Sequence, residues 1–163
     1  MRWIRGWFPG LDFETYTDKF ASSARAVFRQ AYEHAKQLGH TQMNDEDVLL
    51  AFAQTERSFL DELLKRLNLD KESVLQRLSS NPNQYGGSAG IKISEGLRNV
   101  MRHALETARD RNRAHIESID LLIGVFRDER NLSVKLFEEL GAHREDVIKI
   151  IRELASEYNG VNW

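Results

Sequence analysis

The chain has 163 residues, 41% of them hydrophobic and 29% charged, and a formal net charge of −2. These proportions are typical of a folded globular protein and exclude disorder along the whole chain. The absence of cysteine excludes disulfides and thiolate metal sites, and the near-neutral charge excludes a general attraction to nucleic acid. No apolar run is long enough to span a membrane, and the first residues do not form a signal peptide, so we expect a cytoplasmic protein.

Residues 1–18 form an aromatic extension in front of the predicted domain. Trp3, Trp7 and Phe8 lie close together in it, and aromatic side chains at this density often anchor protein interfaces. We therefore expect these residues either to contact a partner or to pack on the domain as a cover. The segment is too short and too weakly charged to serve as a membrane anchor.

Periodic apolar residues predict two helices after this extension. From Phe20 to Leu38 they recur at spacings of three and four, which indicates one face of an amphipathic helix, and Gly39 favours its end. Asn44 and the acidic residues after it are typical of a helix amino end. They predict a second, largely buried helix that contains residues 48–53.

Two further helices complete the first half. Ser58 and Asp61 resemble a capping box and predict a third helix that runs through Leu67. Asp70 predicts the cap of a fourth helix. Because no strand pattern is present, we expect an all-α fold. The second half repeats this order, with predicted helices from Ser94 to Ala108, over residues 119–126, after Asn131 and around residues 147–151.

The two halves match each other without a gap at a shift of about 73 positions, which indicates an internal duplication. Small alanines at positions 31, 35, 104 and 108 predict that the long first helices of the two halves approach each other closely. We therefore expect eight helices related by a pseudo-twofold axis. Identical pairs include Lys19 and Lys92, Arg25 and Arg98, Ala31 and Ala104, Asp47 and Asp120, and Leu63 and Leu136.

The duplication sets the expected boundaries. One domain over residues 19–157 consists of repeat 1 (19–80), a linker (81–90) and repeat 2 (91–157), and a tail follows over residues 158–163. The linker contains the pattern G-x-S-x-G around Ser88, which a hydrolase places between a strand and a helix. Because no core strand precedes this pattern, we interpret the linker as a flexible tether, and a hydrolase or other enzyme that uses Ser88 or a histidine is the alternative.

Five stretches of the sequence resemble the amino-terminal domain of Clp ATPase chaperones. They are AYEHAKQLGH (31–40), DEDVLLAFA (45–53), LNLDKESV (67–74), ESIDLLIGVF (117–126) and LFEELGAHREDV (136–147). The resemblance extends over residues 19–156 and implies an eight-helix, pseudo-twofold domain without catalytic activity. It also implies that the domain recognises substrate or adaptor proteins for an ATPase ring. Since the chain has no phosphate-loop motif, we expect either such a recognition domain or a stand-alone accessory subunit that docks on a Clp protease ring.

Some members of that family bind phosphorylated arginine at two related sites, each with a hydroxyl residue and an acid. Here the first site has Ala21 in place of the hydroxyl and keeps the acid Glu46. The second keeps the hydroxyl of Ser94 but has Ile119 in place of the acid. Thr17 is a substitute for Ala21 only if the first helix begins a turn early. Each site therefore keeps one half of the pair, which argues against phosphoarginine binding.

We expect peptides or adaptor proteins to dock in apolar grooves between the two halves. Grooves of this kind bury a modest area, so we expect weak to micromolar affinities. The candidate contacts border the first two helices of each repeat, and they are Ala21, Glu46, Asp47, Ser94, Ile119 and Asp120.

Arginines on the predicted fifth helix give a third hypothesis. Such a stripe fits an acidic partner or nucleic acid, whereas the acids Glu95, Glu106 and Asp110 on the same helix favour an ordinary solvated face. The five histidines have no metal-binding spacing, so we expect neither a metal nor a cofactor. The stripe consists of Arg98, Arg102, Arg109 and Arg113, with Arg111 beside them.

Overall fold

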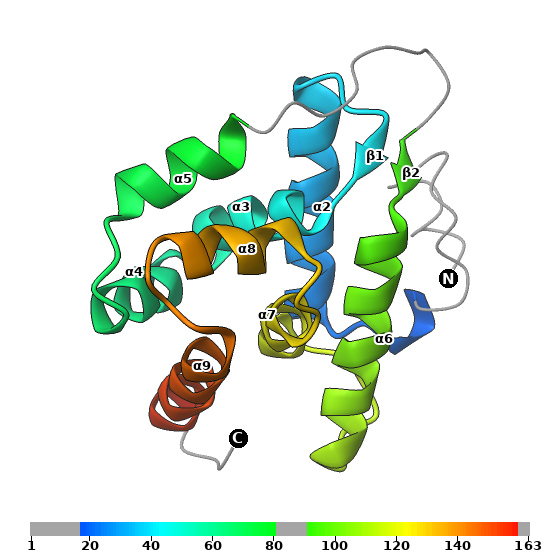
Figure 1. Cartoon of the computed structure of the whole chain (residues 1–163). Coiled ribbons are helices and arrows are strands. Elements are labelled where there is room, and N and C mark those ends of the chain that lie inside the picture. The colour runs from blue at the N-terminus through cyan, green and yellow to red at the C-terminus, as the bar shows by residue number, and fades with distance from the viewer. Residues whose placement is uncertain (1–16, 81–90, 160–163) are drawn as a thin grey trace.

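The computed structural model describes residues 17–80 and 91–159, and within these ranges the chain forms eight α-helices (Figure 1). The predicted all-α class is confirmed. In chain order the elements are η1 (Thr17–Lys19), α2 (Ser22–Gln37), β1 (Gln42–Met43), α3 (Asp45–Thr55), α4 (Arg57–Arg66), α5 (Lys71–Ser79), β2 (Lys92–Ile93), α6 (Glu95–Asp110), α7 (Ser118–Arg127), α8 (Leu132–Glu139) and α9 (Arg144–Asn159). The sequence predictions that lie outside the described residues concern Trp3, Trp7, Phe8, Ser88 and residues 160–163.

The second four α-helices repeat the order of the first four, and three of the four pairs begin at one constant offset. This offset is the one at which the two halves of the sequence match, so the predicted duplication is present in the fold. Helices α2, α3 and α5 begin at Ser22, Asp45 and Lys71, and α6, α7 and α9 begin 73 residues later, at Glu95, Ser118 and Arg144.

The helix ends recur at the same offset. Gly39 (φ 69°) follows α2, and Asn112 (φ 56°) follows α6 at the equivalent position. Asn68 (φ 57°) and Gly141 (φ 98°) follow α4 and α8 in the same way. A left-handed residue at this point lets the following N–H bond back to the last turn of the helix. Glycine and asparagine tolerate this conformation best, so each position holds one or the other in each repeat.

Two short parallel backbone contacts join the repeats. Strands β1 and β2 pair Met43 with Ile93, and an isolated bridge pairs Phe20 with Ile116. Met43 is equivalent to Ile116, and Phe20 is equivalent to Ile93, so exchanging the repeats turns one contact into the other. This is the expected pseudo-twofold relation. The sequence analysis found no strands because two paired residues are too few to show a period.

Helices α3 and α7 lie at the centre of the core (Figure 1), where residues 45–53 and 118–126 are buried. Helix α2 packs chiefly on α3, and α6 packs chiefly on α7, whereas α2 and α6 barely touch. The prediction that the alanines at positions 31, 35, 104 and 108 bring α2 and α6 together is therefore wrong. These alanines are fully buried because each long helix approaches the central helices instead.

The start of α4 also differs from the prediction. Helix α4 begins at Arg57, and Glu56 caps both the end of α3 and the start of α4, so no loop separates the two helices. Ser58 therefore lies inside the helix, and Asp61 pairs with Lys71 (2.6 Å) instead of forming a capping box. The other predicted caps are present at Asn44, Asp70 and Ser94.

Gly124 brings α7 close to the backbone of α6. A β-carbon at this position would lie 2.6 Å from the Val100 carbonyl oxygen and 3.3 Å from the Ala104 nitrogen. Because backbone atoms cannot move aside easily, we expect Gly124→Ala to lower the free energy of unfolding by about 1–3 kcal/mol. That loss outweighs the gain of up to about 1 kcal/mol that alanine offers as a helix former. Urea unfolding followed by circular dichroism measures the change.

Gly96→Ala on α6 is the matched control. Its β-carbon would lie 3.4 Å from the Asn131 Oδ1 atom, an ordinary contact. We therefore expect this substitution to keep or raise the free energy of unfolding. If Gly124→Ala were as stable as the unsubstituted chain, the close approach of α6 and α7 would be contradicted.

Candidate functional site

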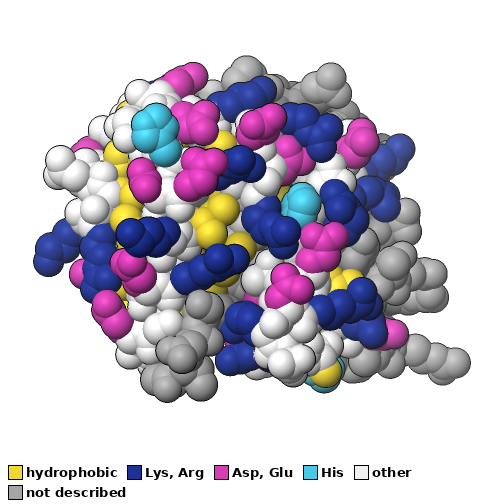
Figure 2. Space-filling view, turned by 60° about the horizontal axis from the view of Figure 1, so that its bottom comes forward, with side chains coloured by type: hydrophobic (Ala, Val, Ile, Leu, Met, Phe, Trp, Pro, Cys, Tyr) yellow, Lys and Arg dark blue, Asp and Glu magenta, His cyan; other side chains and the backbone are white. Residues whose placement is uncertain are grey.

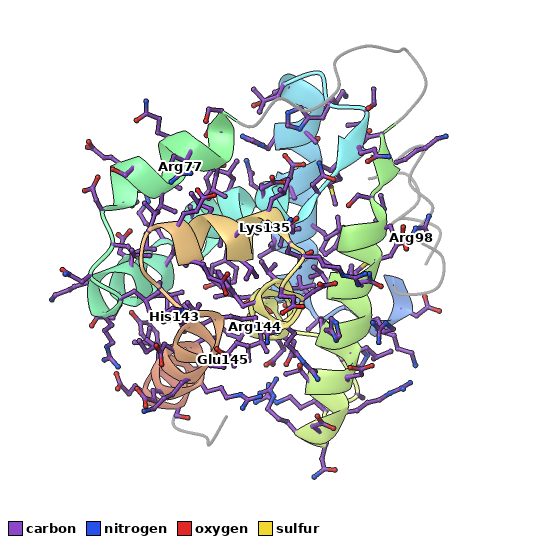
Figure 3. All side chains as sticks on the ribbon, viewed as in Figure 1. Arg77, Arg98, Lys135, His143, Arg144 and Glu145 are labelled. Atoms are coloured by element: carbon purple, nitrogen blue, oxygen red, sulfur yellow. The ribbon has the colours of Figure 1, made fainter. Side chains whose placement is uncertain are left out.

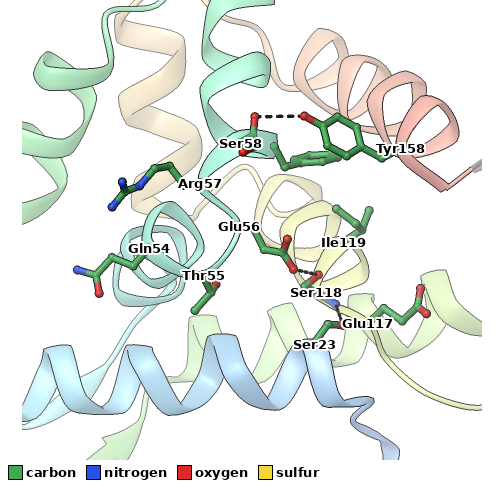
Figure 4. A pocket seen from close by; sticks show the side chains of 11 residues that line it. Ser23, Gln54, Thr55, Glu56, Arg57, Ser58, Glu117, Ser118, Ile119 and Tyr158 are labelled. Atoms are coloured by element: carbon green, nitrogen blue, oxygen red, sulfur yellow. Dashed lines mark hydrogen bonds between the residues drawn. The ribbon is translucent and has the colours of Figure 1, made fainter.

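A groove of about 500 Å³ lies at the seam between the two repeats (Figure 4). It is bordered by the start of α2, the junction of α3 and α4, the start of α7 and the end of α9. We call it the seam groove. Among the residues that line it are Ser23, Glu56, Phe59, Ser118, Ile119 and Tyr158.

Three side chains from different helices give the seam groove an apolar corner. Ile119 and Phe59 are nearly buried, whereas Tyr158 is 55% exposed. The Tyr158 and Phe59 rings pack with their centroids 5.5 Å apart, and the Tyr158 hydroxyl donates to the Ser58 carbonyl at 3.4 Å. An aromatic ring held in this way offers apolar surface at little entropic cost. This corner can therefore receive an apolar side chain of a peptide.

Polar groups form the other side of the seam groove. The Ser118 hydroxyl donates to a carboxylate oxygen of Glu56 (3.0 Å), and the Ser118 N–H donates to the Ser23 hydroxyl oxygen (3.0 Å), as Figure 4 shows. These bonds connect the start of α7 to α2 and to the α3–α4 junction. Within the described residues Glu56 has no ion-pair partner, so its carboxylate can accept hydrogen bonds from a ligand.

Two of the candidate contacts, Asp47 and Asp120, are interior capping residues. Their exposures are 2% and 0%. Asp47 Oδ2 accepts the N–H of Asn44 (2.9 Å), and Asp120 Oδ2 accepts the N–H of Glu117 (2.8 Å). Each bond belongs to a capping box that fixes the start of a central helix. Any effect of these carboxylates on docking therefore passes through the position of α3 and α7.

The other oxygen of each capping carboxylate faces a basic side chain. Asp47 Oδ1 lies 3.2 Å from His34 Nδ1 and 3.3 Å from His40 Nδ1, whereas Asp120 forms an ion pair with Arg111. Burial raises the pKa of the Asp120 carboxyl, although a backbone N–H and Arg111 favour its charged form. Burial likewise lowers the pKa of the Arg111 guanidinium. Each partner of this buried pair therefore depends on the other.

Backbone hydrogen bonds just before α3 and α7 bring the remaining candidate contacts of one repeat beside those of the other. The N–H of Ser94 donates to a carbonyl just before α3 (3.0 Å), the helix that carries Glu46. The N–H of Ala21 makes the equivalent bond just before α7 (2.8 Å), the helix that carries Ile119. The sequence analysis paired these residues within each repeat, but the fold groups them across the repeats. Thr17 lies in η1, ahead of α2, and does not open that helix.

Glu46 lines a second groove, of about 350 Å³, between α5 and α8. Figure 3 labels Arg77 on α5 and Lys135 on α8, and both side chains border this α5–α8 groove. Leu132, which is equivalent to Phe59, is 44% exposed there. In the seam groove an aromatic ring covers Phe59, so the two equivalent grooves differ in shape and polarity.

Three of the five arginines in the predicted stripe are paired with acids, and two of these, Arg111 and Arg113, follow the end of α6 instead of lying on it. Arg102, Arg111 and Arg113 each form an ion pair with an acidic side chain. On the face shown in Figure 2, dark blue basic groups alternate with magenta acidic groups around a small hydrophobic area. These pairings weaken the prediction of a basic surface for nucleic acid, which needs uncompensated positive charge.

The Arg111–Asp120 pair gives a test that separates structural from surface arginines. Arg111→Gln leaves the buried Asp120 carboxylate without its counter-charge, so we expect the free energy of unfolding to fall by about 3 kcal/mol or more. Arg109→Gln, at an exposed position in the last turn of α6, is the control, and we expect a change within about 0.5 kcal/mol. Urea unfolding of both variants measures the difference. Equal effects of the two substitutions would contradict a structural role for Arg111.

Comparisons with solved structures agree with the fold. The crystal structure of the Hsp104 N-terminal domain from Candida albicans has a TM-score of 0.72 at 23% identity, and the match covers 84% of this chain and 91% of that chain. A complex of the ClpV N-domain with a VipB peptide has a TM-score of 0.72 at 20% identity, and the match covers 90% of this chain and 92% of that chain.

Sequence comparisons give the family. The chloroplastic chaperone protein ClpC of Pisum sativum is 25% identical over 173 residues, which cover 90% of this chain but only 19% of the relative. The chain thus spans about a fifth of the length of such relatives. A family model described as the Clp repeat (R) N-terminal domain matches residues 19–140. The chain therefore belongs to the Clp repeat N-terminal domain family.

Proposed function

We propose that the chain is a recognition domain, without catalytic activity of its own, that binds peptide segments of substrate or adaptor proteins for a Clp-type unfoldase or protease. The observation that carries this proposal is the seam groove, where an apolar corner adjoins hydrogen-bonding groups of three different helices. A related fold, the ClpV N-domain, has been solved in complex with a VipB peptide. That complex supports peptide docking as the activity of this chain.

Docking in the seam groove needs two kinds of contact. An apolar side chain of the peptide packs between Ile119 and the Tyr158 ring, and polar groups of the peptide meet Glu56 and Ser23. The groove is small compared with a stable protein interface, so a single peptide binds weakly and exchanges readily. Weak, reversible binding suits a domain that passes a substrate on, and attachment to a multivalent ring raises the effective affinity.

The other candidate contacts have different parts in this proposal. Glu46 lines the α5–α8 groove, which is a second docking position, and Ser94 lies beside the start of α3, the helix that carries Glu46. Ala21 lies beside the start of α7, close to the seam groove. Asp47 and Asp120 support the helix starts from inside and do not meet the peptide.

Two other functions lead to different partners. A stand-alone accessory subunit would use the same grooves on a Clp protease ring, so it is a variant of the proposal rather than a rival. Binding of nucleic acid through α6 is a separate class, and the ion pairs of Arg102, Arg111 and Arg113 speak against it. An oligonucleotide titration at two salt concentrations distinguishes that class, because phosphate binding weakens steeply with salt.

We keep a cytoplasmic location as part of the proposal. Among the described residues, no helix has both the length and the apolar character needed to cross a bilayer. The chloroplastic relatives show that Clp proteins also work in organelles. Fractionation of cells that produce the full chain tests the location.

The seam groove predicts a specific loss of peptide binding in the variant Ile119→Glu. A carboxylate in the apolar corner must be desolvated when an apolar side chain docks, so we expect the Kd for a fluorescein-labelled, permanently unfolded polypeptide to rise about tenfold or more. The fold should tolerate this change, because the equivalent position 46 already holds glutamate. Fluorescence anisotropy measures the Kd.

Ile148→Glu on α9 is the matched control, because Ile148 lies in a different groove and is similarly apolar. We expect this variant to keep the original Kd. If Ile119→Glu and Ile148→Glu bound the polypeptide equally well, the seam groove would not be the docking site.

A further inference from the structure

The carboxylates around the seam groove are only partly compensated. Glu56 accepts a hydrogen bond from Ser118 and has no basic partner among the described residues. Glu117 forms an ion pair with Arg113. Arg57 is the one basic residue among those that line the groove, and it is exposed at the rim. A ligand that combines basic groups with large apolar side chains would therefore match the acidic wall and the apolar corner together.

Residues 2–8 of this chain carry that combination. Arg2 and Arg5 alternate with Trp3, Trp7 and Phe8, and the stretch contains no acid. Arginine pairs well with carboxylates, and aromatic rings bury large apolar areas against tyrosine and isoleucine. The sequence analysis singled out these aromatics, but the proposed docking of external peptides gives them no role.

The stretch of chain between this segment and the groove is long enough for the two to meet within one molecule. The chain enters the described structure at Thr17 and reaches the groove rim at Ser23, on the first turn of α2. The stretch from Phe8 to Thr17 can extend to about 30 Å. Because the segment is tethered beside the groove, its effective concentration there is on the order of millimolar.

We propose that residues 2–8 of this chain occupy the seam groove, with arginine on the carboxylates and an aromatic ring in the corner formed by Ile119, Phe59 and Tyr158. The segment then competes with external peptides for the same surface. A tethered occupant of low intrinsic affinity raises the apparent Kd for weak ligands and yields to strong or multivalent ones. The inference extends the proposed function, but its test needs no external peptide.

Tryptophan fluorescence tests the proposal in the full chain. All three tryptophans, Trp3, Trp7 and Trp163, lie outside the described residues, so Trp163→Phe leaves only the two in the proposed segment. In that background we expect blue-shifted emission and an acrylamide quenching constant lower, by a factor on the order of two, than in the same chain with Ile119→Glu. Replacing Arg2 and Arg5 by serine should increase quenching in the same direction.

Two controls separate the outcomes. Ile148→Glu and Leu132→Glu place the same charge in other grooves, and we expect neither to change the quenching of Trp3 and Trp7. Dilution should leave the emission unchanged, because the contact forms within one molecule. Emission that shifts to the red on dilution would instead assign the groove to the segment of a second copy and overturn the proposal.

Solvent-exposed tryptophans in the Trp163→Phe chain, with quenching that Ile119→Glu does not alter, would also overturn it. That result would leave peptide binding in the seam groove intact, because the anisotropy experiment measures it separately. Conversely, if Ile119→Glu exposes protected tryptophans, and no external polypeptide binds even when Arg2 and Arg5 are replaced by serine, the intramolecular contact stands and the proposed function fails.

Discussion

The exchange of backbone contacts between the repeats is the constraint on which the rest of the structure depends. Phe20 pairs with Ile116 and Met43 pairs with Ile93, and all four side chains are buried. In each contact, the segment before the long helix of one repeat pairs with the loop before the central helix of the other repeat. Because these pairings fix where α3 and α7 begin, the seam groove, which α7 borders, exists only when both repeats have folded together. A further bond crosses between the repeats, because the N–H of Ser133 on α8 donates to the Asp45 carboxylate on α3 (2.9 Å).

Acidic residues at the starts of the central helices form hydrogen bonds that stabilise the fold. Asp47 and Asp120 each accept a backbone N–H, and Asp45 accepts the N–H of Ser133 in the other repeat. Burial raises the pKa of the Asp45 carboxyl, against these hydrogen bonds, so this carboxylate is held in place at some cost in solvation. These acids bond to helix starts, whereas the Glu56 carboxylate lines the seam groove, where it can accept further hydrogen bonds.

Local features were predictable from the sequence, whereas contacts between the repeats were not. Gly39 ended α2 and Asn44 opened α3 as predicted, because a stop and a cap depend only on neighbouring residues. Ile119, which lines the seam groove, was a candidate contact through the duplication and the family resemblance. Glu56 and Tyr158 were missed, because a residue shared by two helices looks like a loop, and the last turn of α9 looks like a polar tail. Periodicity also cannot show which helix a buried alanine faces, so α2 was assigned the wrong neighbour.

The two equivalent grooves have diverged in the residues that line them. Position 119 is isoleucine where position 46 is glutamate, and the Ser23 hydroxyl in the seam groove corresponds to Gly96, which has no side chain. The longer α9 supplies an aromatic cover that the exposed Leu132 lacks within the described residues. The α5–α8 groove also carries charges of both signs, because Arg77 pairs with Glu139 there and Lys135 and Glu46 line the same groove. Duplication therefore preserved the scaffold, while substitution at a few positions gave the two grooves different linings.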